Sequence, residues 1–262
     1  MVNFQRMDRY GMDDLIRIME LLRSPEGCPW DKVQTHQSIR RDMLEEAYEV
    51  AEAIDNQDYE NLKEELGDVL FQVVFHSCMA QEAGKFTFDD VVDGVAQKMV
   101  FRHPHVFGTA EAENTEQALV TWDAQKQVEK GQKTVGDTLD AVARSLPALI
   151  RAQKIQKKAQ KAGFDWDNVD PVLDKISEEV EELKQAVREN SNVEEELGDL
   201  LFAAVKAGRF LQVDGEDALH NACEKFIRRF RRVEALADKP LDQLDIAALE
   251  ALWRSAKQEE QP

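Results

Sequence analysis

Acidic residues recur along the chain at the spacing that brings metal-binding carboxylates together. Glu46 and Glu49 lie three positions apart, and Glu65 and Asp68 repeat that spacing farther along. Residues three apart share one face of a helix, so two such helices would present four carboxylates. The same pattern returns later in the chain, at Glu179, Glu182, Glu196 and Asp199. Because all these candidate ligands are carboxylate oxygens, each set predicts a site for Mg²⁺, with Mn²⁺ as the alternative.

A solvated acidic face is the plain alternative, because 52 of the 262 residues are Asp or Glu and short acidic motifs arise by chance. Two observations favour the metal site. The paired acids occur twice in the same order, and like charges at this spacing would cost about a few tenths of a kcal/mol each without a cation. Iron is the weaker interpretation, because di-iron bundles use Glu-x-x-His where this chain has Asp68 and Asp199. His103 and His105 lack further ligands at zinc-binding spacing, which favours a structural turn.

Two glycines stand inside the acidic blocks. Gly67 and Gly198 each interrupt a sequence that otherwise favours a helix, at a cost of ~1 kcal/mol relative to alanine. A neighbouring element that approaches closely would explain both glycines. We therefore predict close contacts at these two positions.

Basic residues follow each acidic block. Lys98 and Arg102 are four positions apart, and so are Lys225 and Arg229. The net charge of the chain is −19, so a polyanionic substrate needs local cations. Lys and Arg side chains opposite a metal would hold a polyphosphate. A solvated helix face, or a stripe attracted to a membrane, would contain the same residue types.

Helices must position these side chains, and the composition favours helices. The chain has only 12 Gly and 7 Pro, so few turns are expected. Apolar residues recur at helical spacing directly after Glu65, at Leu66, Val69, Leu70, Val73 and Val74. No comparable run alternates with a period of two, so the sequence predicts an all-α fold.

The chain also contains an internal repeat. Glu-Leu-Gly-Asp-Val-Leu-Phe at 65–71 returns 131 positions later as Glu-Leu-Gly-Asp-Leu-Leu-Phe at 196–202. Upstream, the acids of 44–49 match those of 177–182 at an offset of 133. A small drift of this kind is expected when helices are kept and loops change length. The sequence therefore predicts two copies of one helical unit.

The repeat divides the chain into three parts. They are a first helical domain over 1–108, a connector over 109–137 and a second helical domain over 138–262. The connector is rich in Gln, Glu and Lys, and its pattern predicts a helix over 115–129. The second domain is expected to end in a helix, over about 244–258, that carries Trp253.

The charge and the cysteines exclude several classes of protein. With 33 Lys and Arg against 52 Asp and Glu, the chain repels nucleic acids and anionic membranes, so we expect neither as a partner. Its apolar runs fall far short of the ~18 residues of a membrane span, and the N-terminus lacks a signal peptide. Cys28, Cys78 and Cys223 are an odd number at wide spacing, which indicates reduced thiols in the cytoplasm.

These motifs together resemble a known family. Glu-Glu-x-x-Glu followed by Glu-x-x-Asp in both copies, together with Gly27-Cys28-Pro29-Trp30-Asp31-Lys32-x-Gln34-Thr35, resembles the MazG nucleoside triphosphate pyrophosphohydrolases. The resemblance covers nearly the whole chain. It implies a tandem repeat of a MazG-type all-α bundle, usually dimeric, with Mg²⁺ as cofactor. It also implies cleavage of a nucleoside triphosphate between the α and β phosphates, which yields a nucleoside monophosphate and pyrophosphate.

The resemblance further implies roles for individual residues. The metal ligands would be Glu179, Glu182, Glu196 and Asp199, with Glu46, Glu49, Glu65 and Asp68 as a second set. The substrate would be bound by Lys175, Glu178, Glu179, Glu195, Asp199, Asn221, Lys225, Arg228, Arg229 and Trp253. Either Glu178 or Glu195 would orient or deprotonate the attacking water. Trp253 is the candidate for stacking on the nucleobase, although its spacing suits a core tryptophan equally well.

The two copies differ near their basic residues. Asn221 stands one turn before Lys225, and Arg228 follows. In the first copy Gly94 takes the place of Asn221, and no cation corresponds to Arg228. We therefore expect the first site to bind a cation with little turnover. A non-enzymatic acidic scaffold that binds a partner protein is the alternative to an enzyme, and small helical units of this kind favour a homodimer.

Overall fold

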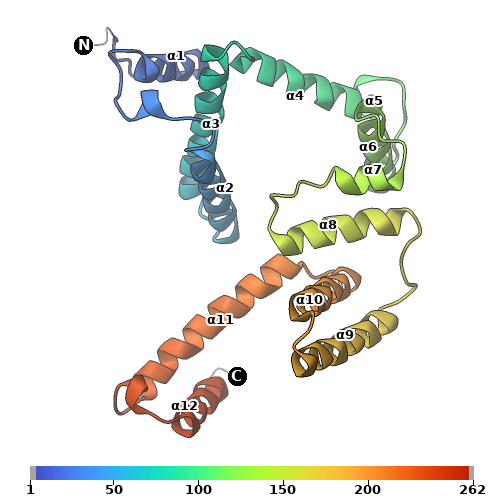
Figure 1. Ribbon diagram of the computed structural model, residues 1–262. Coiled ribbons are helices and arrows are strands. Elements are labelled where there is room, and N and C mark those ends of the chain that lie inside the picture. The colour runs from blue at the N-terminus through green and yellow to red at the C-terminus, as the bar shows by residue number, and fades with distance from the viewer. Residues whose placement is uncertain (1–3, 260–262) are drawn as a thin grey trace. The chain divides into compact units, whose positions relative to one another are not determined.

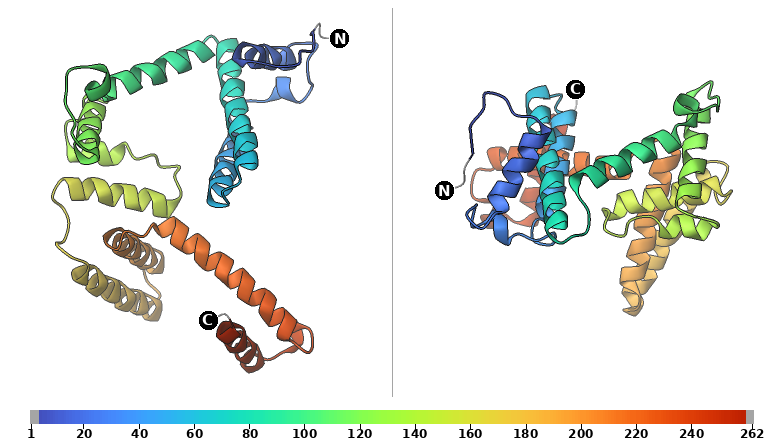
Figure 2. Two further views of the ribbon diagram at one scale, coloured as in Figure 1. Left: turned by 180° about the vertical axis from the view of Figure 1, so that it is seen from behind. Right: turned by 90° about the horizontal axis from the view of Figure 1, so that it is seen from above.

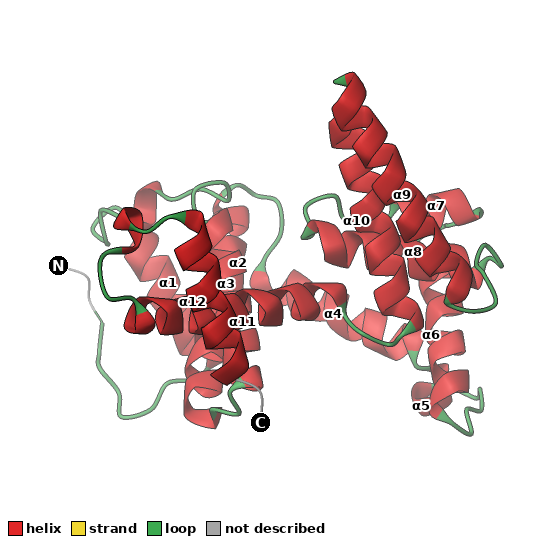
Figure 3. Cartoon of the chain, turned by 90° about the horizontal axis from the view of Figure 1, so that it is seen from below, coloured by secondary structure: helices red, strands yellow, loops and turns green. Residues whose placement is uncertain are grey.

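The computed structural model describes residues 4–259, which form helices and loops without any strand (Figure 3). This confirms the predicted all-α fold. The chain divides into two compact units, Met1–Lys126 and Gln127–Pro262. The finer division into 1–108, 109–137 and 138–262 stays a prediction. None of the described helices is both long and apolar enough to cross a membrane.

The first unit is built on a pair of helices. Its elements are α1 (Met12–Arg23), α2 (Arg40–Asp55), α3 (Tyr59–Glu82), α4 (Phe88–Arg102), α5 (Pro104–Phe107) and the greater part of α6 (Thr115–Glu129). Helices α2 and α3 pack along each other, α1 packs on α3, and α4 leads away from α3 (Figure 1). The buried core lies between α1 and α3 and consists of Met19, Ile39, Val74, Phe75, Cys78 and Met79.

The second unit repeats this arrangement. Its elements are α7 (Val135–Asp140), α8 (Ala148–Lys161), α9 (Asp170–Glu189), α10 (Val193–Phe210), α11 (Gly215–Leu236) and α12 (Ile246–Glu259). Helices α9 and α10 form the pair, α8 packs on α10, and α11 leads away to pack on α12 (Figures 1 and 2). The helices expected over 115–129 and about 244–258 correspond to α6 and α12.

Local sequence signals end and restart the paired helices. Helix α9 ends at Asn190, whose φ of 50° is the left-handed conformation typical of a helix C-terminus. Helix α10 begins only three residues later. In the first unit Gln57 has φ 55°, and the Asp58 side chain then caps α3 by accepting a hydrogen bond from the Asn61 amide. These tight turns fold each second helix back along the first, which places the two carboxylate pairs side by side.

The two helix glycines do not have the close neighbours that we predicted. A Cβ atom added at Gly67 or at Gly198 would meet nothing within 4 Å among the described residues. That prediction is therefore wrong for the single chain. The reason is that both glycines lie on the exposed side of their helix, where no other element of the same unit covers them.

Candidate metal and nucleotide site

The second unit brings three of the predicted ligands together. Carboxylate oxygens of Glu179, on α9, and of Glu196 and Asp199, on α10, all lie within 4.8 Å of one another. Only 5% of Glu179 is exposed, and its Oε2 has no hydrogen-bond partner. A buried carboxylate oxygen without a partner carries a large desolvation cost. A divalent cation between these three carboxylates would remove that cost, so the donor set fits a hard cation.

Lys175 and Asn192 hold the acids of this cluster. The Lys175 Nζ lies 2.7 Å from a Glu179 oxygen, 2.9 Å from Glu178 and 3.9 Å from Glu182. These acids raise the pKa of Lys175 above its usual value, mainly through the hydrogen bond to Glu179. The amide of Asn192 donates to Glu196 Oε1 at 2.6 Å. The cluster therefore already contains one positive charge and one oriented donor.

Two predicted residues lie at the edge of the cluster. Burial, followed by the hydrogen bond with Glu179, raises the pKa of Glu182, so this fourth predicted ligand touches the cluster from one turn along α9. The amide of Asn192 lies 3.4 Å from Glu195 Oε2, and Glu178 is paired with Lys175. Both candidates for orienting water, Glu178 and Glu195, thus lie beside the cluster and outside its buried centre.

The first unit forms a similar cluster without a lysine. Oxygens of Glu46, Glu49 and Glu65 lie within 4.8 Å of one another. Burial raises the pKa of Glu46, and the charge of Asp68 adds to the effect, which shows that the fourth predicted acid is close. Asp42 stands where the second copy has Lys175, at the offset of 133 that relates the two acidic blocks. The sequence position that carries a cation in the second copy therefore carries an acid in the first.

The predicted phosphate-binding residues lie on a different helix from the acids. Asn221, Lys225 and Arg228 are exposed on α11, and Arg229 is partly buried there. Helix α11 contacts α10 and α8, packs mainly on α12, and as a helix leads away from the α9–α10 pair (Figures 1 and 2). The acids and the predicted phosphate ligands of one copy are thus not gathered into one site within the second unit.

Trp253 belongs to the packing between α11 and α12. Its ring centre lies 5.1 Å from that of Phe226 on α11, and the ring is partly buried. An ion pair between Arg232 and Glu259 joins the same two helices. This contact fits the core alternative for Trp253, and it leaves the exposed part of the ring as the surface that could meet a nucleobase.

Arg102, which corresponds to Arg229 in the repeat, is buried in the first copy, whereas Arg229 is only partly buried. Arg102 is only 8% exposed, and its guanidinium carbon lies 5.2 Å from the ring centre of Trp122, on α6. The same indole contacts the His103 ring edge to face at 4.7 Å. Arg102 is therefore a packed residue. This contact adds a structural difference to the sequence difference between the two copies.

Sequence reasoning used Trp30 only as part of a family motif and missed that Trp30 and Trp166 form a matching pair of loops. Trp30 follows α1 and is 55% exposed, and Trp166 follows α8 and is 40% exposed. Trp30 lies 6.5 Å from the Phe75 ring, and the Lys206 Nζ lies 3.9 Å from the Trp166 ring. Phe75 and Lys206 are 131 positions apart, so both tryptophans pack at the same place on the repeat. The Trp-Asp dipeptides at 30–31 and 166–167 were the available signal.

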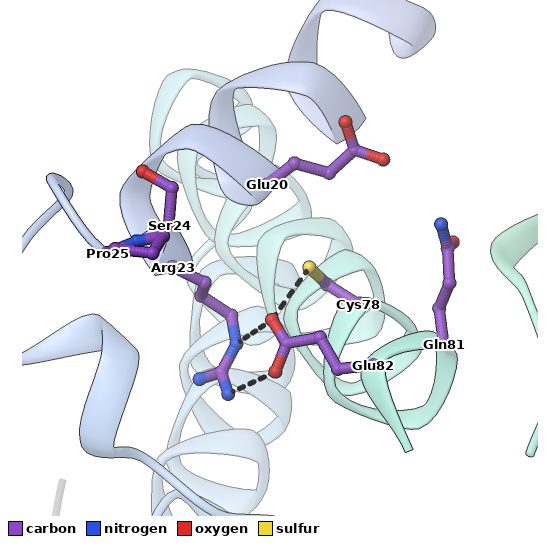
Figure 4. Close-up of a pocket in the computed structure, with 7 residues that line it drawn as sticks. All are labelled: Glu20, Arg23, Ser24, Pro25, Cys78, Gln81 and Glu82. Carbon is purple, nitrogen blue, oxygen red and sulfur yellow. Dashed lines mark hydrogen bonds and ion pairs between the residues drawn. The ribbon is translucent and has the colours of Figure 1, made fainter. Parts of the chain in front are cut away.

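An ion pair anchors each loop, with different residues in the two copies; the pair is half-exposed in the first copy and buried in the second. In the first, Arg23 donates to both oxygens of Glu82 at 2.7 Å beside a pocket under α1 (Figure 4), and also to the Asp31 carbonyl at 2.6 Å. The hydrogen bond from Arg23 lowers the pKa of Glu82. Burial raises the pKa of the neighbouring Cys78 thiol to about 11, which keeps it protonated.

In the second copy the anchor is an acid in the loop itself. Asp165 pairs with Arg209 at 2.5 Å and with Lys206 at 3.3 Å, and both come from α10. Burial opposes the ionisation of Asp165, but the hydrogen bond from Arg209 and those beside it bring its pKa below the usual value. The loop that starts α9 is thus fixed to the helix that carries Glu196 and Asp199.

Two repeats, each with a carboxylate cluster between paired helices, define an all-α protein that can hold divalent cations. The MazG nucleotide pyrophosphohydrolase domain matches residues 34–107 and 168–233. A nucleoside triphosphate pyrophosphohydrolase of Escherichia coli K12 is 48% identical over 257 residues, which cover 95% of this chain and 98% of the relative. The nucleoside triphosphate pyrophosphohydrolase/pyrophosphatase MazG of Thermotoga maritima is 45% identical over 248 residues, 94% of this chain and 95% of the relative. The chain therefore belongs to the MazG family, with the domain present twice.

Proposed function

We propose that this protein hydrolyses nucleoside triphosphates to nucleoside monophosphates and pyrophosphate, with Mg²⁺ as cofactor and Mn²⁺ as a substitute. The observation that carries the proposal is the buried, unpaired oxygen of Glu179 beside Glu196 and Asp199. The family and the names of the relatives support the same reaction. All-carboxylate donors favour Mg²⁺ or Mn²⁺ over softer metals.

Different side chains of the second copy have different roles in this reaction. A bound divalent cation would neutralise the phosphates and polarise their phosphorus–oxygen bonds. Glu179, Glu182, Glu196 and Asp199 hold that cation in the proposal. Glu178 or Glu195 orients the attacking water or accepts its proton, since each lies at the edge of the cluster. Lys175, Lys225 and Arg229 bind the phosphates, with Asn221 and Arg228 beside them, and Trp253 supports the nucleobase.

The test is an assay that separates the possible products. The full chain is incubated with each nucleoside triphosphate and Mg²⁺, and pyrophosphate and orthophosphate are measured separately. We expect pyrophosphate and monophosphate in equal amounts, lost on removal of Mg²⁺ and in Asp199→Asn. Orthophosphate and diphosphate as products would show cleavage of the other bond. An absence of turnover with every triphosphate would favour the acidic scaffold.

We also propose that the active form is a homodimer. Helix α11 exposes large apolar side chains, among them Phe226, Ile227 and Phe230, next to the basic residues Lys225 and Arg228. Such a face needs both an apolar and an acidic partner surface. On α10 of a second copy, exposed Leu197 and Leu201 lie close in sequence to the acids of the cluster. The second copy would thus cover the apolar face and receive the cations.

Sedimentation of the full chain at micromolar concentration tests the dimer. We expect a species of twice the mass of one chain. The variant Ile227→Asp would place a charge on the apolar face and shift the distribution to monomer, whereas Val128→Asp on α6, an exposed apolar residue on another helix, serves as the control. A wild-type monomer under these conditions would contradict the proposal.

The state of the cysteines supports a reducing compartment, for which we propose the cytoplasm. Cys28, Cys78 and Cys223 are free thiols in the structure. Cys223 is exposed, so an oxidising environment would leave it open to reaction with other thiols. Thiol counting on protein purified anaerobically should give three reduced cysteines per chain.

A further inference from the structure

We propose that Lys175 is an internal counter-ion that occupies the carboxylate cluster of the second copy until a divalent cation and a triphosphate arrive together. The inference deepens the proposed function and rests on it for the identity of the incoming ligand. Lys175 would block the cation in the absence of nucleotide and would bind a phosphate in its presence. Cation binding and nucleotide binding would therefore be coupled through this one side chain.

The ammonium group of Lys175 lies among the carboxylates of the cluster. Lys175 lies 2.7 Å from Glu179, whose other oxygen is buried without a partner, and it also reaches Glu178 and Glu182. All four residues lie on one stripe of α9, at spacings of three and four. An incoming cation must share Glu179 with this ammonium group. A divalent cation on the other oxygen of Glu179 would lie close to this ammonium group, and the repulsion between the two positive charges favours withdrawal of Lys175.

Lys175 is long enough to move its ammonium group into solvent. Its side chain is 35% exposed although its head group touches a buried acid, so it can leave toward solvent without disturbing the core. A triphosphate at the cluster offers the displaced ammonium a new anion. The nucleotide thus removes the cost of moving Lys175, and bound nucleotide should tighten cation binding, as linkage requires of two coupled ligands.

The two copies differ at the position of this lysine. The corresponding residue of the first copy is Asp42, and Glu46, Glu49 and Glu65 gather there without a lysine at this position. A carboxylate cluster between the paired helices therefore occurs both with and without the internal cation, although its third member differs between the copies. This difference provides a natural reference, and it predicts that the coupling belongs to the second copy alone.

Mn²⁺ binding without nucleotide tests the inference. The parent is the full chain with Glu49→Gln and Glu65→Gln, so that the second cluster dominates the signal, and the Mn²⁺ affinity is measured by calorimetry and by the loss of the free-ion electron paramagnetic resonance signal. Lys175→Met should bind Mn²⁺ at least about tenfold more tightly than this parent. A cation in direct contact changes the affinity of a carboxylate for a competing cation, such as a proton, by about tenfold or more. If that variant does not fold, Lys175→Gln serves the same purpose.

Lys184→Met is the matched control. Lys184 lies on the same helix and pairs with the exposed Glu181 at 2.7 Å, so it gives the same change in charge away from the cluster. We expect its Mn²⁺ affinity to stay within about twofold of the parent, because exposed charges are screened. An equal gain in Mn²⁺ affinity in both variants would show that only the net charge of the chain matters, and it would overturn the inference. An unchanged Mn²⁺ affinity in Lys175→Met would overturn it as well.

A second arm uses a triphosphate with a methylene group between the α and β phosphates. This analogue should tighten Mn²⁺ binding to the parent at least about tenfold, and it should have a much smaller effect on Lys175→Met. Equal effects on both proteins would overturn the coupling. Pyrophosphate release by the wild-type chain is measured separately, so failure of the proposed reaction would leave the Mn²⁺ result without nucleotide intact.

Discussion

The ammonium group of Lys206 lies 3.9 Å from the centre of the Trp166 ring, at the place on the repeat where Phe75 meets Trp30. A cation over an indole thus replaces an aromatic pair. Lys206 also contacts Asp165, which pairs with Arg209. The loop before α9 is therefore fixed to α10 by charge, a few residues ahead of the helix that carries Lys175 and Glu179.

Removal of the loop anchor should destabilise the second unit. Arg209 and Asp165 have side chains only 6% and 10% exposed, so Asp165→Ala leaves a buried cation without its partner. We expect a loss of about 3–5 kcal/mol in the free energy of unfolding, measured by urea unfolding of the full chain. Glu181→Ala removes an exposed ion pair and should cost at most about 1 kcal/mol. Similar losses in the two variants would show that the buried ion pair contributes no more to stability than an exposed one.

The anchor of the first loop should give a pH-dependent contribution to stability. The hydrogen bond from Arg23 lowers the pKa of Glu82 below its usual value. The carboxylate therefore stabilises the fold above the unfolded-state pKa, about 4.3, and this contribution is lost as the pH falls through the lower folded-state pKa.

This effect is measured as the difference in unfolding free energy between wild type and Glu82→Gln. We expect about 1–2 kcal/mol at pH 7 and a difference that shrinks toward pH 3. A difference that stays constant over the range would mean that the ionised form of Glu82 is not what stabilises the loop.

Gly198 lies on the uncovered side of α10, and a substitution there tests whether a second copy packs on this helix. Nothing lies within 4 Å of a Cβ placed on Gly198, so Gly198→Ala should stabilise the isolated helix by up to about 1 kcal/mol. In the proposed homodimer another copy approaches this face, and the added methyl group should weaken dimerisation and reduce pyrophosphate release. Gly67→Ala is the matched change in the first unit. A dimeric, fully active Gly198→Ala would show that no element approaches α10 at this position.

The two copies should respond differently to loss of a carboxylate. We expect Glu196→Gln or Asp199→Asn to abolish most pyrophosphate release, because the remaining acids repel one another without their cation. Glu65→Gln or Asp68→Asn should leave most of it, since Arg102 is packed against Trp122. The four variants are compared at saturating Mg²⁺. Equal losses from both copies would identify the first site as a second active centre.

Local periodicity accounts for the part of the fold that the sequence predicts. The apolar stripe after Glu65 predicts α3, and the connector pattern predicts α6 over the same residues, Thr115–Glu129. The repeated acids meet in space because a short turn brings two amphipathic helices together. Those features depend on contacts within one or two helices, which sequence spacing can express.

The contacts that sequence reasoning missed are long-range and differ between copies. The loop tryptophans share only a Trp-Asp dipeptide, and their partners, Phe75 and Lys206, have unlike chemistry. Gly198 was assigned a close neighbour that the single chain does not supply. The position of α11 was also beyond reach, because no spacing rule reports the direction in which a helix leaves its repeat.

The divergence of α11 from the α9–α10 pair has a genetic consequence. If the cations of one chain act together with the acids of another, a chain with a defect on α10 can be complemented by a chain with a defect on α11. A chain with Asp199→Asn and a chain with Lys225→Met would each be inactive alone, but co-expression would form mixed pairs with one intact centre. About a quarter of native turnover is expected when the chains assort at random. The same two substitutions in a single chain would show no such complementation.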